Sequence, residues 1–478
     1  MADVYFWRQS LILIADSIHS IGAGFLLSFP SILNPAILSP NATDIIATPQ
    51  EASWINASFG FAGMLGFCVV PPIMQGLGRK FVHIMLNAVV ALGFIIFFFA
   101  NSVPALFVAR SVQGLSAAGV TLTAMIIAEY SDPERRGYFM ILKNMTVSLG
   151  SLVCHSLYFC WDWRQVAALS IVPYLISIIL TFLWPESPSY YAMKGRYKEC
   201  TQSFTYLFGD SPKSKKNLEH LISTQKERRQ QMQMKKIDAF SRCIKTFGRR
   251  DFLKPIIVAF LLTIAVDACG RYYLLAYIIE MVIEITGDSS VAVYCSMASD
   301  LITIFASTLS IYIIRTYKRR TILFTSGFLT AFFMFLLSTV VYLKTAHGIG
   351  ENLNWLTPTI IIFITFISSA GAIPLSFTIL GEIFPLEHKG LGSFATGIIF
   401  TFLYATSMKS LPMMMASIGV GGTFGVFGTI MLVCLVLLLF TLNETKDKTL
   451  QEIEDEIKGI IRAKPELLIE SKPLAAES

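Results

Sequence analysis

The sequence contains little charge. Lys, Arg, Asp and Glu make up 15% of its 478 residues, whereas a soluble globular domain carries about 25%. Hydrophobic side chains make up 54%, which is more apolar surface than a soluble core of this length needs. The two values together argue against a soluble protein and favour a membrane protein.

Motifs of metal binding and catalysis are also missing. The eight cysteines show no metal-ligand spacing and no disulfide framework. No zinc-protease, phosphate-loop, dinucleotide-binding or esterase motif stands in a suitable context. We therefore expect no catalysis, no cofactor and no metal.

Long apolar stretches are abundant. Twelve segments of 18 or more mostly apolar residues follow one another, and each is long enough to cross a bilayer as a helix. Because lipid offers no hydrogen bonds to the backbone, such segments are helices. The sequence therefore predicts an all-α membrane protein with twelve transmembrane helices in two bundles of six, surrounded by lipid.

A basic insert separates the two sets of six. It holds 16 of the 38 Lys and Arg residues and contains helical stretches, and the positive-inside rule places it and both termini in the cytosol. A nucleic-acid partner is implausible for an insert tethered between spans. The chain thus divides into a first bundle, a cytosolic linker, a second bundle and a cytosolic tail, over residues 1–184, 185–254, 255–442 and 443–478.

The two halves resemble each other weakly. "GLGRKFVHIML" after the second span is similar to "TYKRRTILFTS" after the eighth, and "AEYSDPERRG" is similar to "GEIFPLEHKG". The members of each pair lie about half the chain apart, which is typical of the parallel six-helix repeats of major facilitator transporters.

Five motifs occur in order along the chain. They are "SWIN", "ARSVQGLSAAG…AEYSDPERRG", "WPESPSYYAMKGR", "GAIPLSFTILGEIFPLEHKG" and "NETKDKTLQEIE". In these motifs the chain resembles the sugar porters of the major facilitator superfamily, and among them the insect facilitated trehalose transporters. The resemblance implies a plasma-membrane protein that moves a small polar solute, trehalose or a hexose, by alternating access. Two alternatives stay open: a sensor or receptor that does not transport, and a transporter of an ionic or amphiphilic solute.

Charged residues recur where spans meet the predicted cytosolic side. Carboxylates and cations at the inner ends of opposite bundles can pair and so bias one state of a transport cycle; ordinary positive-inside charge is the alternative. The predicted gating residues are Arg79, Glu129, Arg136, Arg320, Glu382 and Lys389.

The resemblance is weakest at the expected substrate site. Where sugar porters read QQxSGIN, the seventh span has Asp267 and Arg271, which are four residues apart and are expected to share one helix face. Two charges inside a membrane are costly unless they pair or face a wet cavity. They are thus either a structural ion pair or part of the solute path. The predicted substrate-binding residues are Asn144, Asp267, Arg271, Tyr272, Tyr277, Gly371, Pro374 and Phe377.

The first loop generates a direct test of the topology. Asn41 begins an Asn-Ala-Thr acceptor in a loop without Lys or Arg. We expect Asn41→Gln to remove all glycosidase-sensitive mass on a gel. A mass shift that persists in this variant would mean that another sequon faces the outside.

Overall fold

The structure is a computed structural model that describes residues 2–39, 44–132, 136–234, 250–347, 355–384 and 389–446. Every regular element in these ranges is a helix, so the prediction of an all-α protein is confirmed there. Predictions that concern Asn41 and residues 447–478 lie outside the described residues.

The first bundle is built from seven helices. They are α1 (Ala2–Leu38), α2 (Pro49–Leu77), α3 (Arg79–Phe99), α4 (Val103–Gly114), α5 (Gly119–Tyr130), α6 (Arg136–Leu157) and α7 (Trp163–Phe182). Helix α1 packs against α6 and α7, while α3 lies between α4 and α7. Helices α4 and α5 follow each other across a short turn and form one continuous apolar stretch.

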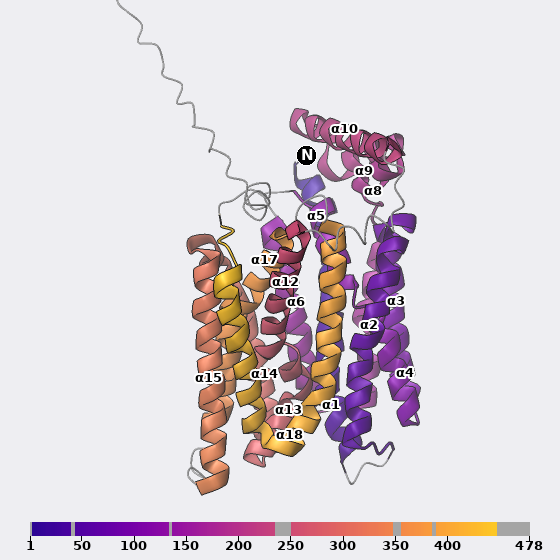
Figure 1. The fold of residues 1–478 in the computed structure, drawn as a ribbon. Coiled ribbons are helices and arrows are strands. Elements are labelled where there is room, and N and C mark those ends of the chain that lie inside the picture. Colours follow the sequence, from indigo (N-terminus) through magenta and orange to yellow (C-terminus); the bar gives the residue numbers. More distant parts are fainter. Residues whose placement is uncertain are drawn as a thin grey trace, which may run out of the picture.

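The second bundle repeats this plan with more interruptions. Its elements are α12 (Arg250–Ala268), α13 (Tyr273–Thr286), α14 (Ser289–Thr316), α15 (Arg319–His347), α16 (Leu356–Ile367), the π-helix η2 (Ser368–Ala372), α17 (Ile373–Glu382) and α18 (Lys389–Thr441). The 53-residue α18 would be about 80 Å long if it were straight. Instead Gly419 has φ 69°, and there the chain turns back along the bundle (Figure 1).

Three helices between the two bundles in the sequence cap one end of the molecule. They are α8 (Pro188–Lys194), α9 (Tyr197–Phe208) and α10 (Pro212–Met234), and they lie at the same end as the N-terminus (Figure 1). We call this the insert end and the opposite end the distal end. The start of α1 is tied to α9, since Gln9 donates a hydrogen bond to the Leu207 carbonyl oxygen at 3.0 Å.

Ten helical stretches of the described residues are long and apolar enough to cross a membrane. The sequence predicted twelve. The difference has two sources: α18 forms one stretch although it runs out and back, and α6, which carries Lys143 among its polar residues, is not one of the ten.

The bundles pack most extensively where α2 meets α18, α6 meets α14 and α1 meets α13. Small residues allow close approach within and between the bundles. A Cβ atom on Gly24 of α1 would lie 2.1 Å from the Val147 carbonyl oxygen of α6, and one on Gly60 of α2 would lie 2.6 Å from the Thr401 carbonyl oxygen of α18. Close backbone approach at small residues is how membrane helices pack when no hydrophobic effect drives them together.

The crossing of α1 and α6 can be tested with one added methyl group. Gly24→Ala should lower the stability of the detergent-solubilised protein by about 1–3 kcal/mol, because the two backbones must move apart. Gly76→Ala is the matched control, since nothing lies within 4 Å of its added Cβ. Equal melting temperatures for the two variants would contradict this close crossing.

Candidate functional site

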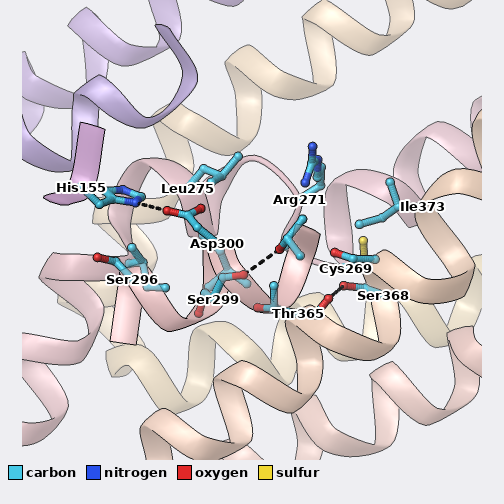
Figure 2. A pocket seen from close by; sticks show the side chains of 15 residues that line it. His155, Cys269, Arg271, Leu275, Ser296, Ser299, Asp300, Thr365, Ser368 and Ile373 are labelled. Carbon is cyan, nitrogen blue, oxygen red and sulfur yellow. Dashed lines mark hydrogen bonds and ion pairs between the residues drawn. The ribbon is translucent and has the colours of Figure 1, made fainter. Parts of the chain in front are cut away.

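A cavity lies where the second bundle faces α6 of the first, and about 400 Å³ of empty space, open solvent included, surrounds its lining residues (Figure 2). Its walls come from the α12–α13 link, from α14 and from the α16–η2–α17 segment, and α6 contributes one residue. The polar lining residues are His155, Arg271, Ser296, Ser299, Asp300, Thr303, Thr365, Ser368 and Ser369. Such a wall offers hydrogen bonds to a polar solute inside an otherwise apolar protein.

The helix is broken where Arg271 enters this cavity. Helix α12 ends at Ala268, α13 begins at Tyr273, and Gly270 between them has φ 96°, which side chains with a Cβ rarely adopt. The prediction that Asp267 and Arg271 share one helix face is therefore wrong, because the turn at Gly270 redirects the chain between them.

Asp267 and Arg271 make their contacts in different parts of the second bundle. Asp267 is 8% exposed and accepts a hydrogen bond from the Ser407 hydroxyl of α18. Arg271 is half-buried and lines the cavity, and among the residues that the structure describes it forms no ion pair; Figure 2 draws no dashed line to it. Asp267 thus ties the end of α12 to α18, while Arg271 presents a positive charge to the cavity.

His155 of α6 closes the first-bundle side of the cavity. Its Nδ1 lies 2.6 Å from Oδ2 of Asp300 in α14, and both side chains are buried. Asp300 lies within the apolar stretch Ser289–Thr316. No sequence spacing connects it with His155, because the two residues are 145 positions apart.

Two predicted tyrosines lie next to the cavity. The Tyr277 hydroxyl is buried, donates to the Met408 carbonyl oxygen at 3.2 Å and accepts from the Asn56 amide of α2 at 2.8 Å. Tyr272 is half-buried, and its ring meets that of Tyr404 edge-on with centroids 5.8 Å apart. Tyr277 therefore joins the two bundles, and Tyr272 packs between the α12–α13 link and α18.

Four other predicted substrate-binding residues do not line this cavity. Gly371 faces α15, because a Cβ there would lie 2.4 Å from the Ser326 hydroxyl oxygen. Pro374 is half-buried, and Phe377 and Asn144 are exposed. The π-helix η2 nonetheless interrupts the α-helix that carries Gly371 and Pro374, and its Ser368 and Ser369 reach the cavity.

The distal end is held shut by contacts that the sequence did not reveal. The Lys409 ammonium of α18 donates to the Ser53 hydroxyl of α2 at 2.8 Å and lies 4.5 Å from the centre of the Trp54 ring. Deeper between the bundles, the buried Arg110 guanidinium donates to the Tyr404 hydroxyl at 3.4 Å. Each contact spans the two bundles and so belongs to this arrangement of them.

At the insert end of the first bundle, two carboxylates hold the start of α3. Arg79 donates two hydrogen bonds of 2.9 Å to the Glu129 carboxylate, and the backbone N–H groups of Arg79 and Lys80 donate to Glu186 at 2.9 and 3.1 Å. Burial raises the pKa of the Glu186 carboxyl, while the N–H groups oppose this shift. A carboxylate at a helix N-terminus also interacts favourably with the helix dipole.

The second bundle has the same arrangement at the start of α15. The backbone N–H groups of Arg319 and Arg320 donate to Glu444 at 3.2 and 3.1 Å, and the Arg319 guanidinium pairs with Glu382. The Arg320 guanidinium donates instead to the Leu439 carbonyl oxygen at 2.7 Å. The internal repeat that the sequence indicated is thus a repeat of structure as well.

Two details of the predicted gate are corrected by this geometry. The cation that pairs with Glu382 is Arg319, which was not among the predicted gating residues, and the two ion pairs lie within each bundle rather than between opposite bundles. Arg136 and Lys389 begin α6 and α18, but their side chains are outside the described part of the structure.

A family model described as "Sugar (and other) transporter" matches residues 23–457 of the chain. The chain belongs to this transporter family. Its fold agrees: the xylose symporter XylE bound to 6-bromo-6-deoxy-D-glucose superposes with a TM-score of 0.72 at 18% identity, over 94% of this chain and 99% of that one. The inward-open form of XylE from E. coli gives 0.73 at 16% identity, over 95% and 99%. The protein is therefore a multi-pass membrane protein with the major facilitator fold.

Similar transporter sequences come from insects. The "Facilitated trehalose transporter Tret1" of Polypedilum vanderplanki is 25% identical over 96% of this chain and 90% of its own length. The protein of the same name from Drosophila virilis is also 25% identical, again over 96% of this chain. The chain spans only about half the length of the Drosophila relatives.

The ion pair between Arg319 and Glu382 can be tested against a matched control, the neighbouring Arg320. Arg319→Gln leaves the half-buried Glu382 carboxylate without its cation and should cost about 1–3 kcal/mol of stability. Arg320→Gln removes a bond to a carbonyl oxygen instead and should cost less. The melting temperatures of the two variants in detergent are compared, and a larger loss in Arg320→Gln would contradict the Arg319–Glu382 pair.

Proposed function

We propose that the chain is a facilitative transporter that moves a small sugar, trehalose or a hexose, across the membrane by alternating access. The observation that carries the proposal is the cavity with charged and hydroxyl-bearing lining residues where the second bundle faces α6, in an arrangement whose distal end is held closed by the Lys409 contacts. Membership of the sugar transporter family and the similarity to insect facilitated trehalose transporters support it.

The topology that goes with this function has twelve spans. Counting α6 and both arms of α18 adds two spans to the ten apolar stretches. The basic insert with α8–α10 then lies in the cytosol together with both ends of the chain, and the distal end faces outward at the plasma membrane. Asn41 is glycosylated in this arrangement.

Within the cavity, Arg271 is the residue that we assign to the solute. A guanidinium presents five N–H donors and no acceptor, so it can bind sugar hydroxyl oxygens. Asp267 and Tyr277 act indirectly, because they hold the two halves of the broken helix against α18 and α2. The two insert-end ion pairs keep each bundle rigid as it rocks.

Uptake by a purified protein tests the proposal. The full chain is reconstituted in liposomes preloaded with unlabelled trehalose, and the entry of external labelled trehalose is followed, with glucose and xylose measured in parallel. Exchange well above that of empty liposomes is expected for one of these sugars. No exchange of any of them, by protein that remains folded, would contradict sugar transport.

Single replacements separate the roles of the two charges. Arg271→Gln should leave the amount and melting temperature of the protein near normal but reduce sugar exchange about tenfold, because it removes a charged donor from the cavity. Asp267→Asn should mainly lower the melting temperature, since Asp267 supports packing against α18. Arg315→Gln, at an exposed position, is the control. Full activity of Arg271→Gln would remove this residue from the solute site.

A further inference from the structure

A buried histidine and a buried aspartate join the two bundles at the cavity wall. His155 of α6 is 1% exposed and Asp300 of α14 is 3% exposed, and their Nδ1 and Oδ2 atoms are 2.6 Å apart. The second imidazole nitrogen, Nε2, lies 2.9 Å from the hydroxyl oxygen of Ser31 in α1. Because the first bundle supplies His155 and Ser31 while the second supplies Asp300, this contact breaks when the bundles separate here.

The hydrogen bonds of His155 determine how many protons the His155–Asp300 pair holds. The Ser31 hydroxyl donates its one proton to the Ser28 carbonyl oxygen at 2.7 Å, so its oxygen can only accept from His155. His155 Nε2 therefore carries a proton. The 2.6 Å contact between Nδ1 and the Asp300 carboxyl needs a second proton, which lies on either atom. The pair thus holds one proton more than a neutral histidine and an ionised aspartate would, and it is neutral overall.

Few other titratable groups face the pair. Arg271 and Cys269 line the same cavity from the α12–α13 link, and Cys154 precedes His155 on α6. Within the described residues, α1 contributes hydroxyls here, and α16, η2 and α17 contribute hydroxyl or apolar groups to the cavity. Arg271 is therefore the one other formal charge in the cavity wall. The positive charge of Arg271 disfavours a His155–Asp300 pair with a net positive charge. This agrees with a pair that takes up one extra proton and is neutral.

We propose that His155 and Asp300 form a proton-binding latch, which takes up one proton when the distal end is closed and releases it when the bundles separate at this point. The inference rests on the proposed alternating access. A state that binds more protons is favoured as the pH falls. Acid therefore stabilises the arrangement with the distal end closed, and sugar exchange depends on pH through this pair.

A distance measurement without any solute tests the latch separately from transport. Spin labels are placed at the insert end on Gln75→Cys of the first bundle and Lys318→Cys of the second, both exposed. The exposed Cys68 and Cys160 are changed to Ser, as is Cys243, which lies outside the described residues. The distribution of label-to-label distances in liposomes is then recorded between about pH 5 and pH 8, the interval in which histidine side chains in general change charge.

The expected result is a shift toward longer insert-end distances in acid, because closing one end of the molecule opens the other. His155→Gln and Asp300→Asn should each abolish this shift, whereas His19→Gln, which removes a histidine buried within the first bundle, should keep it. A distance distribution that does not change with pH, or an unchanged shift in both latch variants, would overturn the proposal. A pH shift that depends on His155 in a protein that exchanges none of the sugars would leave the latch standing and contradict only the proposed substrate.

Discussion

A charge inside a membrane helix is stable only where another group or a wet cavity receives it, and this constraint shapes the whole interior of the protein. Each buried charge lies at a helix break or at a contact between helices. Arg271 enters the cavity at the α12–α13 turn, Asp267 meets Ser407, and His155 meets Asp300. The apolar helices form the scaffold, and these few polar groups decide where the two bundles touch.

The polar contacts are of two kinds: some lie within one bundle, and others cross between the two bundles. The two kinds occur in different parts of the molecule. At the insert end, Arg79–Glu129 and Arg319–Glu382 lie within single bundles and so persist when the bundles move. At the distal end and beside the cavity, contacts such as Lys409–Ser53 cross between bundles and have to break. Rigid bundles joined by breakable contacts are what alternating access requires, because the protein then exchanges two arrangements instead of deforming continuously.

The sequence was a good guide to the fold and a partial guide to the site. Apolar length and the internal repeat predicted the helical bundles, because both signals are local or periodic. The expectation that Asp267 and Arg271 share one helix face failed, since helix spacing does not apply once Gly270 between them takes a positive φ. Arg320 was predicted as a gating residue and Arg319 was not, because adjacent basic residues look alike in a sequence, although it is Arg319 that pairs with Glu382. The His155–Asp300 contact spans 145 positions and two bundles, and no spacing rule could have found it.

The proposed transport requires the two bundles to separate at the distal end, which is closed in this structure. Cross-linking tests this requirement most directly. Ser53→Cys and Lys409→Cys replace two side chains whose ends are 2.8 Å apart across the bundles. A short bismaleimide should join them, and the joined protein should no longer exchange labelled trehalose, whereas either single variant treated in the same way should continue to exchange it. Exchange at an undiminished rate by fully cross-linked protein would contradict alternating access.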